Sequence, residues 1–186
     1  MSVLERGPNG ATALFSDDLR YRYTLRRVLR EGNWRIVWLL LNPSTADAFK
    51  PDPTVSRCIE WTRRWGADIA DVVNAFALRS PYPTDLYEAA AKNPHRIWTE
   101  LGADEVNDNH IRETCAGAKL VIAGWGNHGD DPKLGRRGEY MRQMLRAAGI
   151  TLHHFGVSKS GSPLHPLARG KSFVPYDREP TIFEAA

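Results

Sequence analysis

The hydrophobic residues of this chain are concentrated in short runs that each end abruptly in polar or turn-forming residues. The longest run, at 35–41, reads Arg-Ile-Val-Trp-Leu-Leu-Leu and stops at Asn42-Pro43-Ser44. A continuous apolar run bounded by turn residues is typical of a strand buried on both faces. Pro43 cannot continue a sheet ladder, so the strand is predicted to end there. Similar runs predict further strands at 71–79, 119–129 and 151–156.

Between these runs the apolar residues follow a helical spacing. The clearest helix is predicted over 54–65. Asp52 is its predicted N-cap, Pro53 suits the first helical position and Gly66 suits the terminator. Two more helices are predicted over 107–116 and 138–148.

Strands that alternate with helices at this spacing are typical of right-handed βαβ units and a parallel sheet. We therefore predict a single α/β domain over residues 1–186. Its expected form is a three-layer sandwich, with a mostly parallel central sheet and helices on both faces. The segment 20–29 alternates between apolar and polar residues, which predicts an antiparallel strand at the N-terminal edge of the sheet.

Length and composition limit the class of protein. A chain of 186 residues is long enough for a sizeable core. It has no apolar stretch near the ~20 residues that span a bilayer, and the first residues lack the apolar core of a signal peptide. We therefore predict a cytoplasmic protein without a membrane partner. Cys58 and Cys115 have no metal or redox spacing and are predicted to be buried free thiols.

The net charge is only +3, but the positive residues are clustered. The clusters lie at 20–30, 57–64 and 133–137. Such clusters suit phosphate groups, which makes a nucleotide or single-stranded nucleic acid a candidate partner. Each cluster taken singly is equally consistent with a solvated surface. The sequence leaves the oligomeric state open.

Polar residues gather where the predicted strands end, and ligands of open α/β sheets bind outside the carboxyl ends of the strands. The candidates are Asn42, Pro43, Ser44 and Asp47 after the first core strand, Asn74 and Arg79 in and after the second, Gly124, Trp125, Gly126 and His128 after the third, and His165 and Pro166 in a later loop. No metal-binding spacing accompanies them, so neither a metal nor another cofactor is predicted.

Several of these residues also have a structural interpretation. Ser44 and Asp47 are equally suited to capping a turn, and Trp125 is equally suited to the core. Arg79 suits either a phosphate or a carboxylate partner. Asn74 is different, because an amide inside an apolar strand is costly to bury without partners.

The motifs together resemble a bacterial and phage family catalogued as domain-of-unknown-function family 1643. The resemblance rests on Leu-Asn-Pro-Ser-Thr-Ala-Asp at 41–47, Val-Val-Asn-Ala-Phe-Ala-Leu-Arg at 72–79, Gly-Trp-Gly-Asn-His-Gly at 124–129 and His-Pro-Leu at 165–167. It brings no established activity.

The order of the motifs is also distantly similar to the uracil-DNA glycosylase superfamily. Asn42-Pro43 resembles the first motif of that superfamily, Asn74 its base-reading Asn, Gly124-Trp125-Gly126 its third element and His165-Pro166 its final loop. The resemblance implies a glycosylase-like fold. It also implies that Asn42 positions water, that His165 donates to the departing base and that Asn74 reads the base edge. Phe49, Phe76 or Trp125 would supply the wall on which the base stacks.

The chain departs from that pattern at two places. Leu167 follows His165-Pro166 where the superfamily has a phosphate-gripping Ser, and Asp47 adds a carboxylate to the first motif. These differences favour a free nucleoside or nucleotide over duplex DNA. The leading hypothesis is an enzyme that acts on a base or N-glycosidic bond. The alternatives are a non-catalytic nucleotide- or nucleic-acid-binding domain, and an unrelated hydrolase or transferase that uses Asp47 and His165.

Two geometric expectations follow from the resemblance. Asn42, Asn74, Trp125 and His165 should line one pocket at the carboxyl edge of the sheet. The arginine clusters at 20–30 and 57–64 should flank that pocket if the substrate is a polynucleotide.

Overall fold

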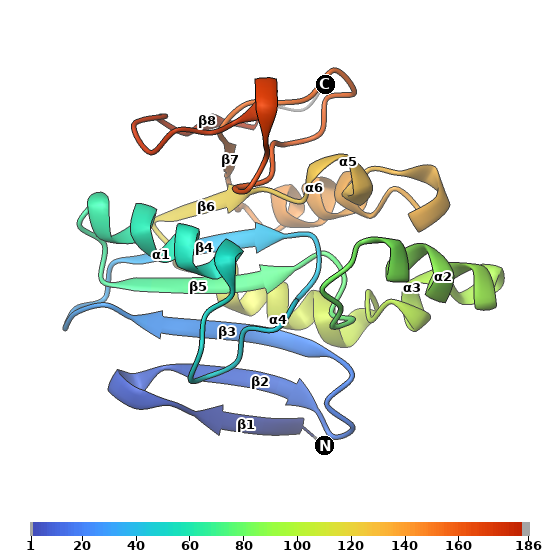
Figure 1. Ribbon diagram of the computed structural model, residues 1–186, viewed down its shortest axis with the longest axis horizontal. Coiled ribbons are helices and arrows are strands. Elements are labelled where there is room, and N and C mark those ends of the chain that lie inside the picture. The colour runs from blue at the N-terminus through green and yellow to red at the C-terminus, as the bar shows by residue number, and fades with distance from the viewer. Residues whose placement is uncertain (1, 184–186) are drawn as a thin grey trace.

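The computed structural model describes residues 2–183, which form one mixed sheet of eight strands with helices packed on it (Figure 1). The strand order is β1-β2-β3-β5-β4-β6-β7-β8. The strands are β1 Ser2–Arg6, β2 Thr12–Ser16, β3 Arg22–Val28, β4 Arg35–Leu40, β5 Ile69–Asn74, β6 Leu120–Ala123, β7 Leu152–His154 and β8 Thr181–Ile182.

Six α-helices occur in the described part of the chain. They are α1 Pro53–Arg64, α2 Thr84–Lys92, α3 Ile97–Glu100, α4 Glu105–Cys115, α5 Gly126–Gly129 and α6 Arg137–Ala147. In Figure 1, α1 crosses in front of the sheet, whereas α4 and α6 lie behind it. The α/β class and the helices on both faces are therefore confirmed.

The centre of the sheet is parallel, and its margins are antiparallel. β4 pairs in parallel with β5 and β6, and β6 pairs in parallel with β7. All other pairings are antiparallel, so the sheet is mixed and only its core matches the prediction. β3 is antiparallel to β5, as predicted, but it is not an edge strand because the β1–β2 hairpin continues the sheet beyond it.

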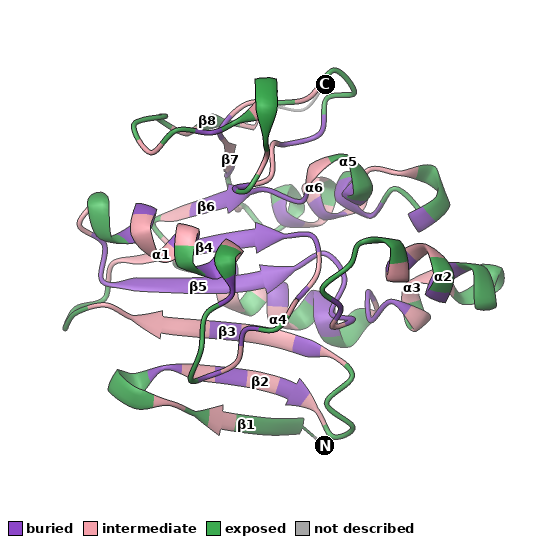
Figure 2. Cartoon of the chain, in the orientation of Figure 1, coloured by how far each residue is buried: buried purple, intermediate pink, exposed green. Residues whose placement is uncertain are grey.

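The continuous apolar run at 35–41 is explained by two cores, one on each face of β4. Ile36, Trp38 and Leu40 point into the core beneath α1. Val37 and Leu39 point into the opposite core, which α4 and α6 cover. Figure 2 shows the resulting burial of β4, β5 and β6, in contrast to the exposed strand β1. A strand covered on both sides needs apolar residues at every position rather than at alternate ones.

Helix α1 begins as its sequence predicts, and it does so beside the carboxyl ends of the strands. The Asp52 carboxylate accepts a hydrogen bond of 2.8 Å from the Val55 amide, and Pro53 occupies the first turn. Gly66 follows the helix with φ +73°, a conformation in which glycine has no steric cost. The predicted helices at 107–116 and 138–148 correspond to α4 and α6.

Two further observations concern predictions made from composition. Cys58 and Cys115 are buried free thiols, as predicted. Among residues 2–183, no helix is both long enough and apolar enough to cross a membrane.

A buried arginine joins α6 to the end of β5. Arg137 is fully buried, its Nε donates 3.0 Å to the Ala75 carbonyl, and its guanidinium pairs with Asp108 of α4. Tyr140 donates to the same carboxylate at 2.9 Å. The ion pair therefore fixes two helices against the strand end next to the site described below.

Replacing Arg137 by Met should destabilise the protein by roughly 3–5 kcal/mol, because Asp108 would remain as an uncompensated buried charge. The double variant Arg137→Met/Asp108→Asn removes that charge while leaving an acceptor for Tyr140, and should regain part of the loss. Urea unfolding of the three proteins tests this. A double variant no more stable than Arg137→Met would show that the buried charge is not the cause.

Candidate functional site

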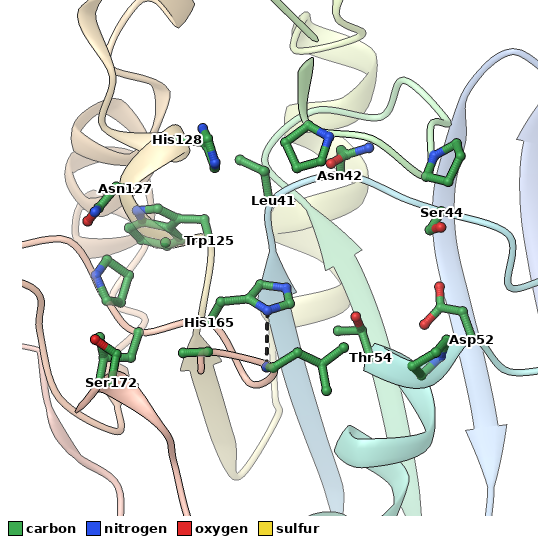
Figure 3. A pocket seen from close by; sticks show the side chains of 18 of the residues that line it. Leu41, Asn42, Ser44, Asp52, Thr54, Trp125, Asn127, His128, His165 and Ser172 are labelled. Carbon is green, nitrogen blue, oxygen red and sulfur yellow. Dashed lines mark hydrogen bonds between the residues drawn. The ribbon is translucent and has the colours of Figure 1, made fainter. Parts of the chain in front are cut away.

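An open cavity of about 570 Å³ lies at the carboxyl edge of the parallel strands. Its walls come from the segments that follow β4, β5, β6 and β7, together with the start of α1 (Figure 3). Among the predicted site residues, Asn42, Ser44, Trp125, Gly126, His128 and His165 line it. This is the place at which parallel α/β sheets bind ligands.

Asn42 joins two walls of the cavity and leaves one polar atom available. Its amide nitrogen donates 2.9 Å to the Ser80 carbonyl and 3.4 Å to the Leu78 carbonyl, which holds the loop after β4 against the segment after β5. The Pro43 carbonyl strengthens this junction by accepting from the Ser80 amide at 2.8 Å. Asn42 Oδ1 has no hydrogen-bond partner among the described residues, so the side chain offers the cavity an acceptor.

His165 is a neutral hydrogen-bond donor. Its Nδ1 accepts 3.1 Å from the Leu167 amide, so in the uncharged ring the proton is on Nε2. Burial lowers the pKa of His165 to about 4; nearby Asp52 opposes this shift and His128 adds to it. Figure 3 shows the ring projecting into the cavity. At neutral pH the imidazole therefore presents an N–H without a positive charge.

His128 has the opposite hydrogen-bonding character. Tyr87 Oη lies 2.8 Å from His128 Nδ1 and 2.8 Å from Asp131 Oδ2. Hydrogen bonds from the Lys133 amide and from Tyr87 keep the pKa of Asp131 below its usual value, so its carboxylate only accepts. Tyr87 therefore donates its one proton to Asp131, and His128 Nδ1 must donate to Tyr87. In the neutral ring, His128 Nε2 is left as an acceptor.

Asp52 supplies a carboxylate to the same cavity. Its side chain is buried, and Oδ1 caps α1 through the Val55 amide. Oδ2 has no hydrogen-bond partner among the described residues. Thr54, the second residue of the same helix, adds a hydroxyl to the wall. The capping role predicted for Asp52 is confirmed, and its place in the cavity is an addition.

The two glycines of Gly124-Trp125-Gly126 let the loop of His165 approach the end of β6. A Cβ at Gly124 would lie 2.9 Å from the Pro166 ring, so a larger residue would push that loop away. Gly126 has φ +67° and its amide donates 3.0 Å to the Pro163 carbonyl. Trp125 is only 1% exposed and its indole donates to Asp130, so it forms a fixed wall of the cavity.

Asn74 does not lie in the cavity, contrary to the geometric expectation. Its side-chain oxygen accepts 3.2 Å from buried Arg22, and its carbonyl accepts 3.0 Å from the Asn107 side chain. The cost of burying this amide is thus offset inside the protein. A base-reading role for Asn74 is not supported, because its partners are structural.

Asp47 and Arg79 also lie outside the cavity, and Pro43, Gly124 and Pro166 are not among the residues that line it. Asp47 caps its own turn by accepting 2.8 Å hydrogen bonds from the Phe49 and Lys50 amides. Arg79 donates 3.0 Å to the Leu19 carbonyl and stacks on the Phe15 ring. The three aromatic candidates for a stacking wall differ as well. Phe49 is exposed away from the cavity and Phe76 is in the core, which leaves Trp125.

Most arginines of the predicted clusters are engaged elsewhere. Arg26 and Arg30 pair with Asp71 and Asp68, and Arg63 and Arg64 pair with Glu60. Arg57 contacts the Val174 carbonyl and the rings of Trp61, Phe173 and Tyr176. No Lys or Arg of the described segment lines the main cavity. No group of three His, Cys, Asp or Glu within residues 2–183 is arranged to hold a metal ion.

The sequence did not identify Tyr87 or Asp131 as site residues, nor Ser80 as the hydrogen-bond partner of Asn42. Tyr87 belongs to α2, a helix for which no prediction was made, and Asp131 follows the glycine-rich motif by only two residues. Tyr87 contacts His128 and Asp131 across separations of 41 and 44 residues, and no local spacing encodes such contacts.

The lowered pKa of His165 predicts a pH-dependent stability. The folded value, about 4, lies below the unfolded value of ~6.5, so the unfolded chain takes up a proton first. This contribution is fully present above pH ~6.5 and is lost as the pH falls towards 4, by on the order of 2–3 kcal/mol. Burial lowers the pKa of His153 and His154 too, in the same direction.

Urea unfolding at pH 7.5 and pH 4.5 measures this loss. His165→Asn should reduce the difference between the two pH values, whereas His95→Asn, at an exposed position, should leave it unchanged. An identical pH dependence in wild type and His165→Asn would contradict the assignment.

A family model described as "Protein of unknown function (DUF1643)" matches residues 22–167. Comparison with curated proteins and with solved structures finds no similar protein. The matched segment begins with β3 and ends in the loop of His165, so it includes all the parallel strands whose ends form the cavity. The chain belongs to the DUF1643 family.

Proposed function

We propose that the main cavity binds the base and sugar of a nucleoside or nucleotide and that the protein hydrolyses the N-glycosidic bond between them. The observation that carries this proposal is that a neutral donor, His165 Nε2–H, and an unpartnered acceptor, Asn42 Oδ1, line the same cavity. Bond cleavage leaves an electron pair on the base nitrogen and positive character on the sugar. A donor near the base and acceptors near the water and sugar meet those needs.

Each polar group then has a role. His165 donates to the departing base, and being neutral it does so without needing to titrate. Asn42 Oδ1 accepts a hydrogen bond from the attacking water. The Asp52 carboxylate stabilises the positive charge that develops on the sugar. His128 Nε2, oriented through Tyr87, accepts the proton that the water loses.

The motif order supports the same chemistry. Asn42-Pro43, Gly124-Trp125-Gly126 and His165-Pro166 resemble motifs of the uracil-DNA glycosylase superfamily, and residues of all three line or adjoin the cavity. Asn74 departs from that pattern. We assign the reading of the base edge instead to Asn127, a second amide on the wall, whose Oδ1 accepts 3.1 Å from Ser160 and whose Nδ2 stays available.

The alternative is a non-catalytic domain that binds the same ligands. The specific observation in its favour is the structural use of Asn42, whose amide nitrogen already ties two loops together. The reading as an unrelated hydrolase using Asp47 and His165 has little support, because Asp47 caps a turn outside the cavity.

Single-turnover release of free base, measured over a panel of nucleosides and nucleoside monophosphates, tests the proposal. His165→Ala should slow release by about 10²–10³-fold, since one stabilising donor is lost. Asp52→Asn should also slow it, while its amide oxygen still caps α1. Melting temperatures and helix content of each variant separate these effects from unfolding. A wild-type protein that binds a panel member yet releases no base would establish the non-catalytic alternative.

Tyr87→Phe isolates the role of His128. The ring would remain, but His128 Nδ1 would lose the acceptor that orients it, so base release should fall by up to about 10²-fold. Tyr82→Phe, at an exposed tyrosine outside the cavity, is the matched control. An unchanged rate of base release in Tyr87→Phe would contradict the role assigned to the contact between Tyr87 and His128.

A further inference from the structure

A second cavity of about 400 Å³ lies beside the main one, and Ser44, Ser80 and Pro81 line both. The remaining lining residues are Leu19, Arg20, Thr45 and Arg79. We call this cavity the arginine subsite. It has two guanidinium groups and no carboxylate among its lining residues, whereas the main cavity has a carboxylate and no cationic side chain.

We propose that the arginine subsite binds the phosphate group of the ligand whose base and sugar occupy the main cavity. The identity of that base and sugar rests on the function proposed above, whereas the binding of phosphate does not. Arginine suits phosphate because its planar guanidinium can donate two parallel hydrogen bonds to the phosphate oxygens. The Ser44 and Thr45 side chains add two hydroxyl donors at the border with the main cavity.

Arg79 is held in place but retains unused donors. Its guanidinium lies 4.7 Å from the centre of the Phe15 ring, and Nη1 donates 3.0 Å to the Leu19 carbonyl. Nε is buried without a hydrogen-bond partner, and no carboxylate pairs with the group in the described part of the chain. A guanidinium that lines a cavity and is already held in place, with donors that its structural contacts do not use, binds an anion with little loss of side-chain freedom.

Arg20 is presented by a constrained turn. Leu19, just before it, has φ +58°, which is uncommon for a residue other than glycine. The Arg20 carbonyl accepts 3.0 Å from the Arg79 amide, so the turn and the segment after β5 are joined. Its guanidinium lies over the Tyr21 ring and near the Asp18 carboxylate, and its salt-bridge partner Glu100 is 3.5 Å away, with both side chains partly exposed. Such pairs contribute little, so a phosphate can compete for Arg20.

This arrangement divides the ligand by charge. The uncharged base and sugar lie among the histidines, Asn42 and Asp52, and the phosphate lies outside them, past Ser44. Placing the phosphate there keeps it away from the Asp52 carboxylate, which would repel it. A nucleoside monophosphate should therefore bind better than its nucleoside, even though no basic residue lines the main cavity.

The affinities of the common nucleosides and of their 5′-monophosphates, measured by calorimetry, test the subsite. The monophosphate should bind about 10- to 100-fold more tightly, as one or two charge-assisted hydrogen bonds permit. Arg79→Gln and Arg20→Gln should each remove most of this gain and leave nucleoside affinity unchanged. Arg63→Gln is the matched control, because Arg63 also pairs with a glutamate at the surface but lies outside both cavities.

Inorganic phosphate gives a readout that needs neither a base nor turnover. Its ³¹P resonance should broaden on addition of wild-type protein and of Arg63→Gln, but not of Arg20→Gln. The Arg20 variant carries the test if Arg79→Gln fails to fold after losing its contacts with Leu19 and Phe15. A short single-stranded oligonucleotide, compared with the mononucleotide, shows whether a free monoester or a phosphodiester is the preferred source of the phosphate.

The outcomes separate this proposal from the proposed function. Phosphate binding that depends on Arg20, without release of any base, supports the subsite and contradicts the hydrolase. Base release from nucleosides and monophosphates with equal efficiency, and no ³¹P broadening, overturns the subsite and leaves the hydrolase in place.

Discussion

The pairing of β4 with β5 continues past the ends of both strands, and the cavity depends on that continuation. Beyond the regular ladder, the Leu41 carbonyl accepts 3.0 Å from the Phe76 amide and the Pro43 carbonyl accepts 2.8 Å from the Ser80 amide. Asn42 lies between these bonds and adds two more through its side chain. Because Pro43 ends the strand without ending the pairing, two loops are held at fixed separation. These hydrogen bonds therefore hold together two of the loops that form the main cavity.

The opposite wall of the main cavity forms where glycines pack closely against a proline-containing loop. Gly124 brings the end of β6 against Pro166, and Gly126 joins it to Pro163. The two histidines of the cavity make opposite hydrogen bonds through Nδ1. Nδ1 of His165 accepts from the Leu167 amide, whereas Nδ1 of His128 donates to the Tyr87 hydroxyl. The Nε2 atom of the neutral His165 ring therefore donates, whereas Nε2 of a neutral His128 ring accepts.

The parts of the fold that could be predicted from the sequence are those for which local pattern and burial agree. The core strand in the run at 35–41 and the helix after Asp52 were of this kind, since a doubly buried strand and a capped helix each leave a local signature. The β1–β2 hairpin was missed because β1 is largely exposed and β2 is fully buried only at alternate positions, so neither strand has a continuous apolar run. Asn74 shows a different limit. Its burial was predicted to require partners, but a sequence cannot distinguish an internal partner such as Arg22 from a ligand.

The same limit applies to the arginines, many of which are engaged inside the protein or in ion pairs at its surface. Arg22, Arg57 and Arg137 are used to satisfy carbonyls and stack on rings inside the protein. Others neutralise Asp68, Asp71 and Glu60. Arg79 differs from Arg22, Arg57 and Arg137 in that it lines a cavity, while its structural contacts use only part of its hydrogen-bonding capacity. The clustering of arginines along the chain does not show which of them have partners and which have unused donors, because that depends on the residues that folding brings close to them. Spare donors beside a cavity, rather than net charge, are therefore the physical basis on which a phosphate site can be assigned in this protein.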